Sequence, residues 1–261
     1  MPPAVMIQVN TCDWLAGAAA LAPASIDLLY ADIPFNTGAP KCTPIGAGRV
    51  YGRLSALGAS GAAYADAFAD TAGFLAWLEA RLRATLPALT PAASILIHCD
   101  WRTSHRVRVL LDDLLSPGAF VNHLIWSYGL GGSSPRRFAR KHDDILWYSL
   151  NPATCYFEPP RIPATSARLR GQTKKMTDVL DIPSLNNMAA ERTGYPTQKP
   201  LALLRLLVNA CCPPGGVVLD PCCGSGTTLV AAAELARGAI GFDRSPVAVS
   251  LARRRVAAST R

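Results

Sequence analysis

The sequence predicts an α/β fold with a doubly wound, mostly parallel sheet, and the clearest evidence lies near the C-terminal end. Val217–Asp220 is a short apolar segment that ends in an acidic residue, and a turn containing Gly224 and Gly226 follows it. A segment rich in alanine and leucine comes next, and the apolar run 239–242 then leads to Asp243. Strand, glycine turn, helix, strand and acidic residue together form half of a nucleotide-binding α/β unit.

Other segments supply the remaining strands and helices of such a sheet. Ile26–Asp32 is typical of a second buried strand that ends in an acidic residue. Apolar residues at helical spacing predict core helices over 72–89 and 201–210. We expect 120–128 and 144–150 to pair as antiparallel strands, so the sheet is predicted to be mixed at one side.

Composition restricts the kind of protein. The 261 residues suit one domain with a modest insertion, and half of them are hydrophobic, enough for a full core. We expect no membrane span and no signal peptide, because apolar runs are short and the first residues lack a charged and an apolar region. The eight cysteines include no C-x-x-C pair, which predicts a reduced cytoplasmic chain and no metal site. The net charge of +8 favours a polyanionic partner, although many basic proteins bind none.

The glycine turn restricts the choice of ligand. A third glycine, which a dinucleotide turn requires, is absent after Gly226, and no lysine follows to make a P-loop. Asp220 at the strand end suits a ligand that carries positive charge, such as the ammonium and sulfonium groups of S-adenosylmethionine. Asp243 follows Gly224 at close to the ~20-residue spacing expected of a carboxylate that holds a ribose. The alternative is a turn that only closes the structural unit.

Asp32, Ile33, Pro34 and Phe35 are the candidate catalytic residues, because they follow a strand where α/β sheets place their sites. An exocyclic amine on a nucleobase is a weak nucleophile, and Asp32 with the carbonyl of Ile33 would each accept one of its hydrogens. Pro34 would fix that carbonyl in advance, and Phe35 would stack on a base rotated out of the duplex. The alternative is a plain strand exit.

Four motifs resemble those of a known family. Asp32-Ile-Pro-Phe35 is similar to the D-P-P-Y/F motif of DNA amino-methyltransferases, and Asp220-Pro-Cys-Cys-Gly-Ser-Gly226 to their D-P-F-x-G-S-G motif. Tyr195-Pro-Thr-Gln-Lys-Pro200 resembles the P-T-Q-K-P segment of the β, or permuted, subgroup, and Arg140-Lys-His-Asp-Asp-Ile-Leu-Trp-Tyr-Ser149 resembles its K-H-D-x-I-L-x-Y-S region. The resemblance implies a Rossmann-like, circularly permuted methyltransferase fold in which the catalytic motif precedes the cofactor motif.

Two positions depart from the family pattern. Ile33 replaces the first proline of the catalytic motif, so the turn is expected to lose rigidity, and activity with it. Cys222 replaces the usual phenylalanine beside the cofactor. Cys223 invites comparison with the nucleophile of carbon-5 cytosine methylation, but that chemistry needs a Pro-Cys loop on another strand, so both thiols are interpreted as turn packing.

The resemblance also implies a cofactor site for S-adenosylmethionine. Thr197, Gln198 and Lys199 would close the pocket, and Asp13 would lie near the adenine ring unless it only caps the helix that follows it. The cofactor residues implied are Asp13, Thr197, Gln198, Lys199, Asp220, Pro221, Cys222, Gly224, Ser225, Gly226 and Asp243.

The family arrangement divides the chain into three parts. Residues 1–150 would form the catalytic part, with a long loop over 36–71 that closes over the site, and 194–261 the cofactor-binding part of the same domain. Between them, 151–193 is rich in proline and basic residues and is the predicted target-recognition insertion. The DNA-binding candidates are Arg136, Arg137, Arg140, Lys141, Arg168, Arg170, Lys174 and Lys175.

We therefore predict a site-specific methyltransferase for double-stranded DNA, acting on adenine N6 first and cytosine N4 second. The aspartate that leads the catalytic motif favours adenine, whereas a leading serine favours cytosine. The rivals are a catalytically inactive DNA-binding protein with this fold and an NAD-dependent oxidoreductase, which the missing third glycine disfavours. We expect a bacterial cytoplasmic protein that joins the nucleoid when acting, and leave open a homodimer and a cognate restriction endonuclease.

Overall fold

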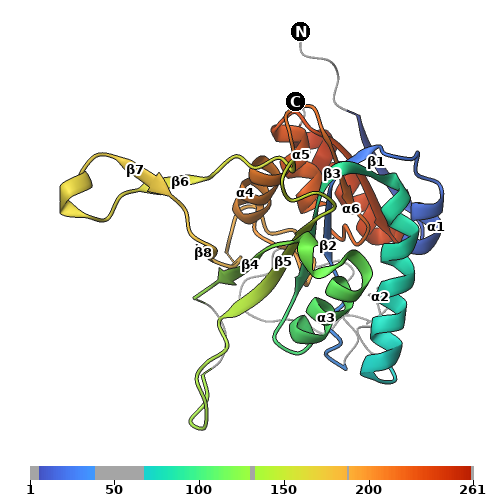
Figure 1. Cartoon of the computed structure of the whole chain (residues 1–261), viewed down its shortest axis with the longest axis horizontal. Helices are drawn as coiled ribbons and strands as arrows, with labels where there is room; N and C mark the ends of the chain where they lie inside the picture. The colour runs from blue at the N-terminus through green and yellow to red at the C-terminus, as the bar shows by residue number, and fades with distance from the viewer. Residues whose placement is uncertain (1–5, 39–67, 130–132, 187, 260–261) are drawn as a thin grey trace.

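The computed structural model describes residues 6–38, 68–129, 133–186 and 188–259, and within them a twisted sheet is covered by helices on both faces (Figure 1). Its eight strands follow the order β1-β10-β9-β2-β3-β5-β4-β8, and β6 and β7 form a separate pair. The strands are β1 Ile7–Thr11, β2 Ile26–Asp32, β3 Leu89–Cys99, β4 Phe120–Ser127, β5 His142–Ser149, β6 Arg161–Pro163, β7 Thr173–Lys175, β8 Val179–Asp181, β9 Val217–Asp220 and β10 Gly238–Asp243. The α-helices are α1 Trp14–Ala19, α2 Thr71–Thr85, α3 Ser104–Leu115, α4 Leu201–Cys211, α5 Thr227–Glu234 and α6 Pro246–Ser259.

The C-terminal strands β9 and β10 lie between β1 and β2, which is the predicted permuted arrangement. β9 is parallel to both of its neighbours, β10 and β2. From β9 the chain continues toward β1, whereas from β2 it continues toward β3, so the strand order reverses between β9 and β2. The carboxyl ends of these two strands therefore flank the switch point at which doubly wound sheets bind ligands.

The predicted antiparallel pair is confirmed. β5 is antiparallel to both β3 and β4, with Ile97 opposite Leu146 on one side and Leu124 opposite Ile145 on the other. Because β5 lies between two strands and is covered on both faces, Asp143–Ser149 are buried without interruption. Its central residues Ile145–Tyr148 are therefore all apolar or aromatic instead of alternating with polar ones.

Each face of the sheet has its own core. Leu207 of α4 and Leu229 of α5 belong to a cluster on one face, and Trp14 of α1, Phe74 of α2 and Leu111 of α3 belong to a cluster on the other. The helix expected over 72–89 ends earlier than predicted, at Thr85, and a 3-10 turn with Pro87 at its start leads into β3. The helix expected over 201–210 is α4.

The segment predicted for target recognition, 151–193, contains more regular structure than its sequence indicates. β6 and β7 pair as an antiparallel hairpin that projects away from the sheet (Figure 1). β8 then returns and adds to the sheet edge, parallel to β4, where Leu180 is buried. These strands have three residues each, too few to show a period in the sequence.

Most of the loop predicted over 36–71 lies outside the described residues. Its described ends are held together, because Asn36 Oδ1 accepts a hydrogen bond from the backbone N–H of Phe68 at 3.1 Å. Among the helices that the structure describes, none is long and apolar enough to cross a membrane.

Candidate active site

A cavity of about 300 Å³ opens at the carboxyl ends of β2 and β9, at the switch point of the sheet. It joins the two motifs, because Asp32 and Pro34 line it from one side and the turn after β9 from the other. The predicted cofactor residues that line it are Asp13, Thr197, Gln198, Lys199, Asp220, Pro221, Cys222, Gly224, Ser225 and Asp243. Ile33, Phe35 and Gly226 are predicted site residues outside this lining.

Asp32 ends β2 with its two carboxylate oxygens in different environments. Oδ2 lies 2.6 Å from Nζ of Lys199, and both side chains are largely buried. Oδ1 is shielded from solvent, and no partner is found for it within the described residues. A buried carboxylate oxygen without a donor is costly, so its environment is completed when a ligand supplies an N–H.

Ile33 is buried at 2 % exposure and belongs to the same core cluster as Trp14 and Phe74. Its backbone N–H donates to the carbonyl of His98 at 3.3 Å, which extends the pairing of β2 with β3. A proline at this position has no N–H to donate. Ile33 therefore makes a strand hydrogen bond that the usual proline cannot make, and the loss of rigidity expected from it stays a prediction.

Phe35 lies between Lys199, the partner of Asp32, and His98 near the end of β3. Its ring centroid is 5.0 Å from Nζ of Lys199, within range of a cation–π contact, and 5.9 Å from the ring of His98. Phe35 is partly buried, and Pro34 between it and Ile33 lines the cavity. The motif thus holds an aromatic ring next to Asp32.

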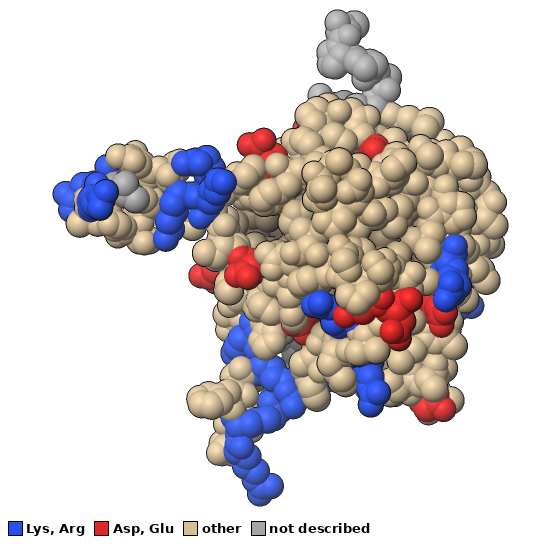
Figure 2. Space-filling model, in the orientation of Figure 1, with Lys and Arg blue, Asp and Glu red and all other residues tan. Residues whose placement is uncertain are grey.

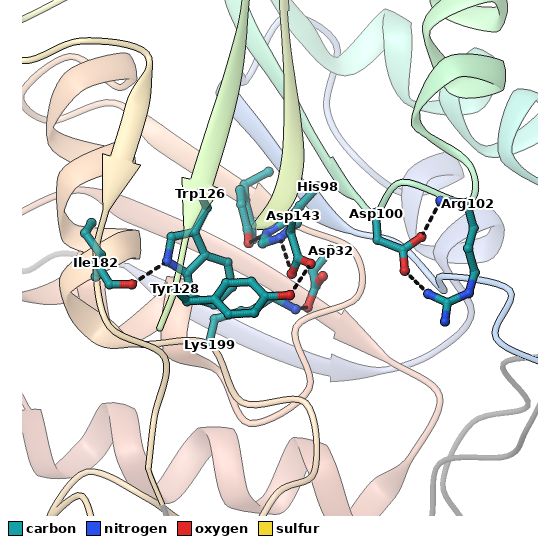
Figure 3. A network of polar contacts seen from close by, with 10 residues as sticks. Asp32, His98, Asp100, Arg102, Trp126, Tyr128, Asp143, Ile182 and Lys199 are labelled. Atoms are coloured by element: carbon teal, nitrogen blue, oxygen red, sulfur yellow. Dashed lines mark hydrogen bonds and ion pairs between the residues drawn. The ribbon is translucent and has the colours of Figure 1, made fainter. Parts of the chain in front are cut away.

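A buried polar network lies close to Asp32 (Figure 3). His98 is fully buried, and its two ring nitrogens contact the Tyr30 hydroxyl at 2.8 Å and Asp143 Oδ2 at 3.2 Å. The other oxygen of Asp143 accepts a hydrogen bond from the Tyr128 hydroxyl at 3.0 Å. Burial raises the pKa of Asp143, but hydrogen bonds from His98 and Tyr128 and the nearby charges of His98 and Lys199 outweigh it and lower the pKa overall. His98, near the end of β3, thus has a partner for both ring nitrogens.

On the β9 side, the glycine turn is held by two carboxylates. Asp220 Oδ1 accepts the N–H of Cys222 at 3.1 Å, and Asp243 accepts the N–H of Gly224 at 2.9 Å through Oδ2 and that of Ser245 at 2.8 Å through Oδ1. Burial raises the pKa of Asp220 to about 7 and that of Asp243 above its ordinary value. A site with buried acidic groups of raised pKa favours a cationic ligand.

Glycine is required at the two positions of the turn for different structural reasons. Gly224 has φ +49°, and a Cβ there would lie 2.9 Å from Cε1 of Tyr195, so glycine brings the turn close to the T-Q-K-P segment. Gly226 has φ +78°, and a Cβ there would lie 2.6 Å from Cβ of Ala252 in α6. Gly226 therefore permits helix packing, whereas the sequence assigned it to the cofactor.

Asp13 is the N-cap that the sequence offered as one interpretation, and its place near the adenine ring stays a prediction. Its side chain caps α1 by accepting the N–H of Leu15 at 2.9 Å, and it also lines the cavity. Both carboxylate oxygens lie 2.9 Å from Nη2 of Arg81 on α2, whose guanidinium stacks over Trp77 at 4.4 Å. Burial raises the pKa of Asp13, but the contacts with Arg81 and Leu15 lower it overall.

The T-Q-K-P segment positions Lys199 through an internal hydrogen-bond network. Gln198 accepts hydrogen bonds from the backbone and hydroxyl of Thr193 at 2.8 and 2.7 Å and donates to the carbonyl of Glu191 at 2.7 Å. Its amide thus holds the loop that precedes α4. Sequence reasoning did not assign the other residues that line the cavity to the site. Tyr195 and Cys223 belong to the motifs that it named, and the rest are Trp14, Tyr30, Phe68, Trp77, Arg81, Thr227, Thr228 and Arg244.

The turn cysteines are poor nucleophiles. Burial and the neighbouring carboxylates of Asp220 and Asp243 raise the pKa of both Cys222 and Cys223 well above the ordinary thiol value. A thiolate is the reactive form, so both side chains remain neutral thiols at neutral pH. This agrees with their interpretation as turn packing.

Basic residues gather on two projections, the loop between β4 and β5 and the β6–β7 hairpin (Figure 2). Exposed predicted DNA-binding residues are Arg136, Arg137, Arg140, Arg168, Arg170 and Lys175, and those partly buried are Lys141 and Lys174. Arg161 lies directly opposite Lys175 in the hairpin. Like charges in cross-strand positions are destabilising on their own, and a polyanion removes that repulsion.

A family model described as DNA methylase matches residues 26–254, which includes both motifs and the strands between them. The chain belongs to this DNA methylase family. The match begins at the first residue of β2 and ends within α6, so the cavity lies almost entirely in the matched part.

Two curated proteins and a solved structure are also similar to this chain. M.ScaI, a type II methyltransferase of Streptomyces caespitosus, is 32% identical over 143 residues, which are 49% of this chain and 47% of that protein. The match thus spans about half of M.ScaI. M.HpaI, a type II methyltransferase of Haemophilus parainfluenzae, is 27% identical over 241 residues, 89% of this chain and 68% of that protein. The crystal structure of the M1.HpyAVI–SAM complex has the same fold, with a TM-score of 0.62 and 21% identity over 96% of this chain and 100% of that one.

Proposed function

We propose that this family member transfers a methyl group from S-adenosylmethionine to the exocyclic amine of a base in double-stranded DNA, adenine N6 first. One observation carries the proposal. Asp32 ends β2 with a solvent-shielded Oδ1 that has no partner within the described residues, beside a cavity that reaches the glycine turn. An amine N–H is the donor that such an oxygen lacks.

The catalytic motif suits this reaction. With Oδ2 held by Lys199, the carboxylate of Asp32 is fixed and only Oδ1 remains for the target amine. The carbonyl of Ile33 would accept the second amine hydrogen, and Pro34 limits its movement. Accepting both hydrogens draws the amine away from conjugation with the ring, and Phe35 would stack on the base.

The residues around the glycine turn suit the proposed cofactor. When bound, S-adenosylmethionine supplies a methyl group attached to a sulfonium, a good leaving group. Asp220 is 2 % exposed, and no cation pairs with it in the described ranges, so it is suited to hold the methionine ammonium. Asp243 would hold the ribose hydroxyls. The volume of about 300 Å³ is at the lower end for small-molecule sites.

The two basic projections would hold the DNA. The loop between β4 and β5 and the β6–β7 hairpin carry the exposed arginines, and each phosphate contact releases counterions and makes binding dependent on salt. The division into catalytic, target-recognition and cofactor parts stays a prediction. So do the homodimer, the cognate restriction endonuclease and the cytoplasmic location.

The test is mass spectrometry of nucleosides from unmodified DNA incubated with the protein and S-adenosylmethionine. We expect N6-methyladenine from the wild type and none from Asp32→Ala. The matched control is Asp113→Ala, because Asp113 is an exposed aspartate on α3. Detection of N4-methylcytosine instead would show that the target is cytosine, the second candidate base. Cofactor binding without any methylated base would refute the proposal, as would methylation by Asp32→Ala.

A further inference from the structure

The loop between β4 and β5 presents one aromatic side chain fully to solvent. Phe138 is 99% exposed, more than any other large hydrophobic residue that the structure describes. A phenylalanine in water forfeits the stabilisation that burial provides. Three exposed arginines surround it in the sequence: Arg136, Arg137 and Arg140.

The base of this loop is held firmly. The guanidinium of Arg140 stacks over the ring of Trp101, with its central carbon 3.4 Å from the ring centroid. Across the loop, the N–H of Tyr128 donates to the carbonyl of Lys141 at 2.9 Å, and the Lys141 ammonium donates to the carbonyl of Gly129 at 3.2 Å. The exposure of Phe138 therefore belongs to a loop with a fixed base.

The residues at the two ends of this loop are also connected to the active site. The Tyr128 hydroxyl donates to Asp143, which contacts His98 (Figure 3). The ring of His98 lies 5.9 Å from that of Phe35. The loop thus extends from the strand pair whose buried network supports the catalytic motif. Whatever the loop binds is aligned with the site by these strands.

We infer that Phe138 is a wedge that enters the base stack of the bound DNA duplex. The inference rests on the proposed function, since DNA is the ligand. The positive charge around the ring favours DNA as the partner, because arginines on both sides of Phe138 in the sequence would bind phosphates. Their binding would bring the apolar side chain against the base steps, where apolar wedges unstack bases. A base must leave the stack to reach Asp32, and a wedge lowers the cost of its departure.

The experiment measures unstacking separately from methylation. Thymines react with permanganate when they are unstacked, so their reactivity in protein-bound duplexes is compared between wild type and variants. We expect Phe138→Ala to lose about tenfold in reactivity per bound complex, the scale of one aromatic stack, and Phe138→Leu to retain part of it. Val247→Ala removes an exposed apolar side chain from α6, a helix that packs against α5, β1 and β10, and should match the wild type.

Methylation of the same DNA, measured in parallel, separates the two proposals. Unstacking that depends on Phe138 without methylation would refute the proposed function and support the wedge. Methylation with unstacking equal in wild type and Phe138→Ala would overturn the wedge alone. A change in self-association of Phe138→Ala, with unstacking unaltered, would assign the ring to a protein contact and overturn it too.

Discussion

Asp220 offers the sharpest test of the electrostatics of the site. Its carboxyl group is buried, with a pKa raised to about 7, and it accepts hydrogen bonds from the backbone of Cys222 and the side chain of Thr228. Asp220→Asn keeps the shape and an acceptor for Cys222 but removes the charge. We expect the variant to be more stable than the wild type at neutral pH and to bind S-adenosylmethionine more weakly.

The magnitude follows from linkage. Between the unfolded pKa of about 4 and the folded value, the native state of the wild type binds more protons than the unfolded state, so its stability falls as pH rises. One pKa unit corresponds to about 1.4 kcal/mol, so the free energy of unfolding lost through Asp220 reaches at most about 4 kcal/mol. Above about pH 7 the loss is complete and constant.

The assay is urea unfolding of wild type and Asp220→Asn without cofactor, from about pH 4 to about pH 8. Other groups cancel in the difference between the two proteins, which should be near zero at the acidic end and grow toward neutrality. Calorimetric titration with S-adenosylmethionine should show wild-type affinity rising through this range and the affinity of the variant staying low and flat. A stability difference that does not change with pH would refute the reasoning.

Three further outcomes are expected. Lys199→Met leaves Asp32 without its cation, so kcat in the methylation assay should fall about 10- to 100-fold. The melting temperature should also fall, because a largely buried carboxylate loses its partner. Gly226→Ala should lower the free energy of unfolding by about 2–5 kcal/mol, from a left-handed φ and a clash with α6. Gly215→Ala, with a similar φ of +75° and open space around it, should cost only about 1–2 kcal/mol. Cys223→Ser should retain methylation, because the pKa of the Cys223 thiol is raised well above the ordinary value and the thiol is a poor nucleophile. A covalent adduct that the wild type forms with DNA and Cys223→Ser does not would contradict this.

The sequence was most informative where a local pattern fixes a position in the sheet. An apolar run ending in an acidic residue places that residue at a strand's carboxyl end, and this held for Asp32 and Asp220. Because parallel strands of a doubly wound sheet have their carboxyl ends at one edge, the two motifs meet although they are far apart in the chain. The antiparallel pair of β4 with β5 was also predicted correctly.

Long-range partners were not predictable from the sequence. Arg81 pairs with Asp13 across helices α1 and α2, and neither residue has a local pattern that reveals the other. The same applies to Asp143 and His98, which meet only through the register of β3 with β5. Glycine positions were predicted, but not whether each one faces a ligand or a neighbouring helix, because both needs exclude a Cβ.

The two strand-end aspartates differ in their surroundings, and this difference supports the proposal that they hold different ligands. Asp32 has a permanent cation, Lys199, so its charge is already balanced and its free oxygen is suited to a neutral amine. Asp220 is more deeply buried and has hydrogen bonds but no cation within the described residues, so ionisation there is unfavourable until a cation arrives. Under the proposed function, we therefore expect the positively charged group to bind on the β9 side and the neutral base on the β2 side. Burial and pairing alone would then give the carboxylates of two adjacent strands different tasks.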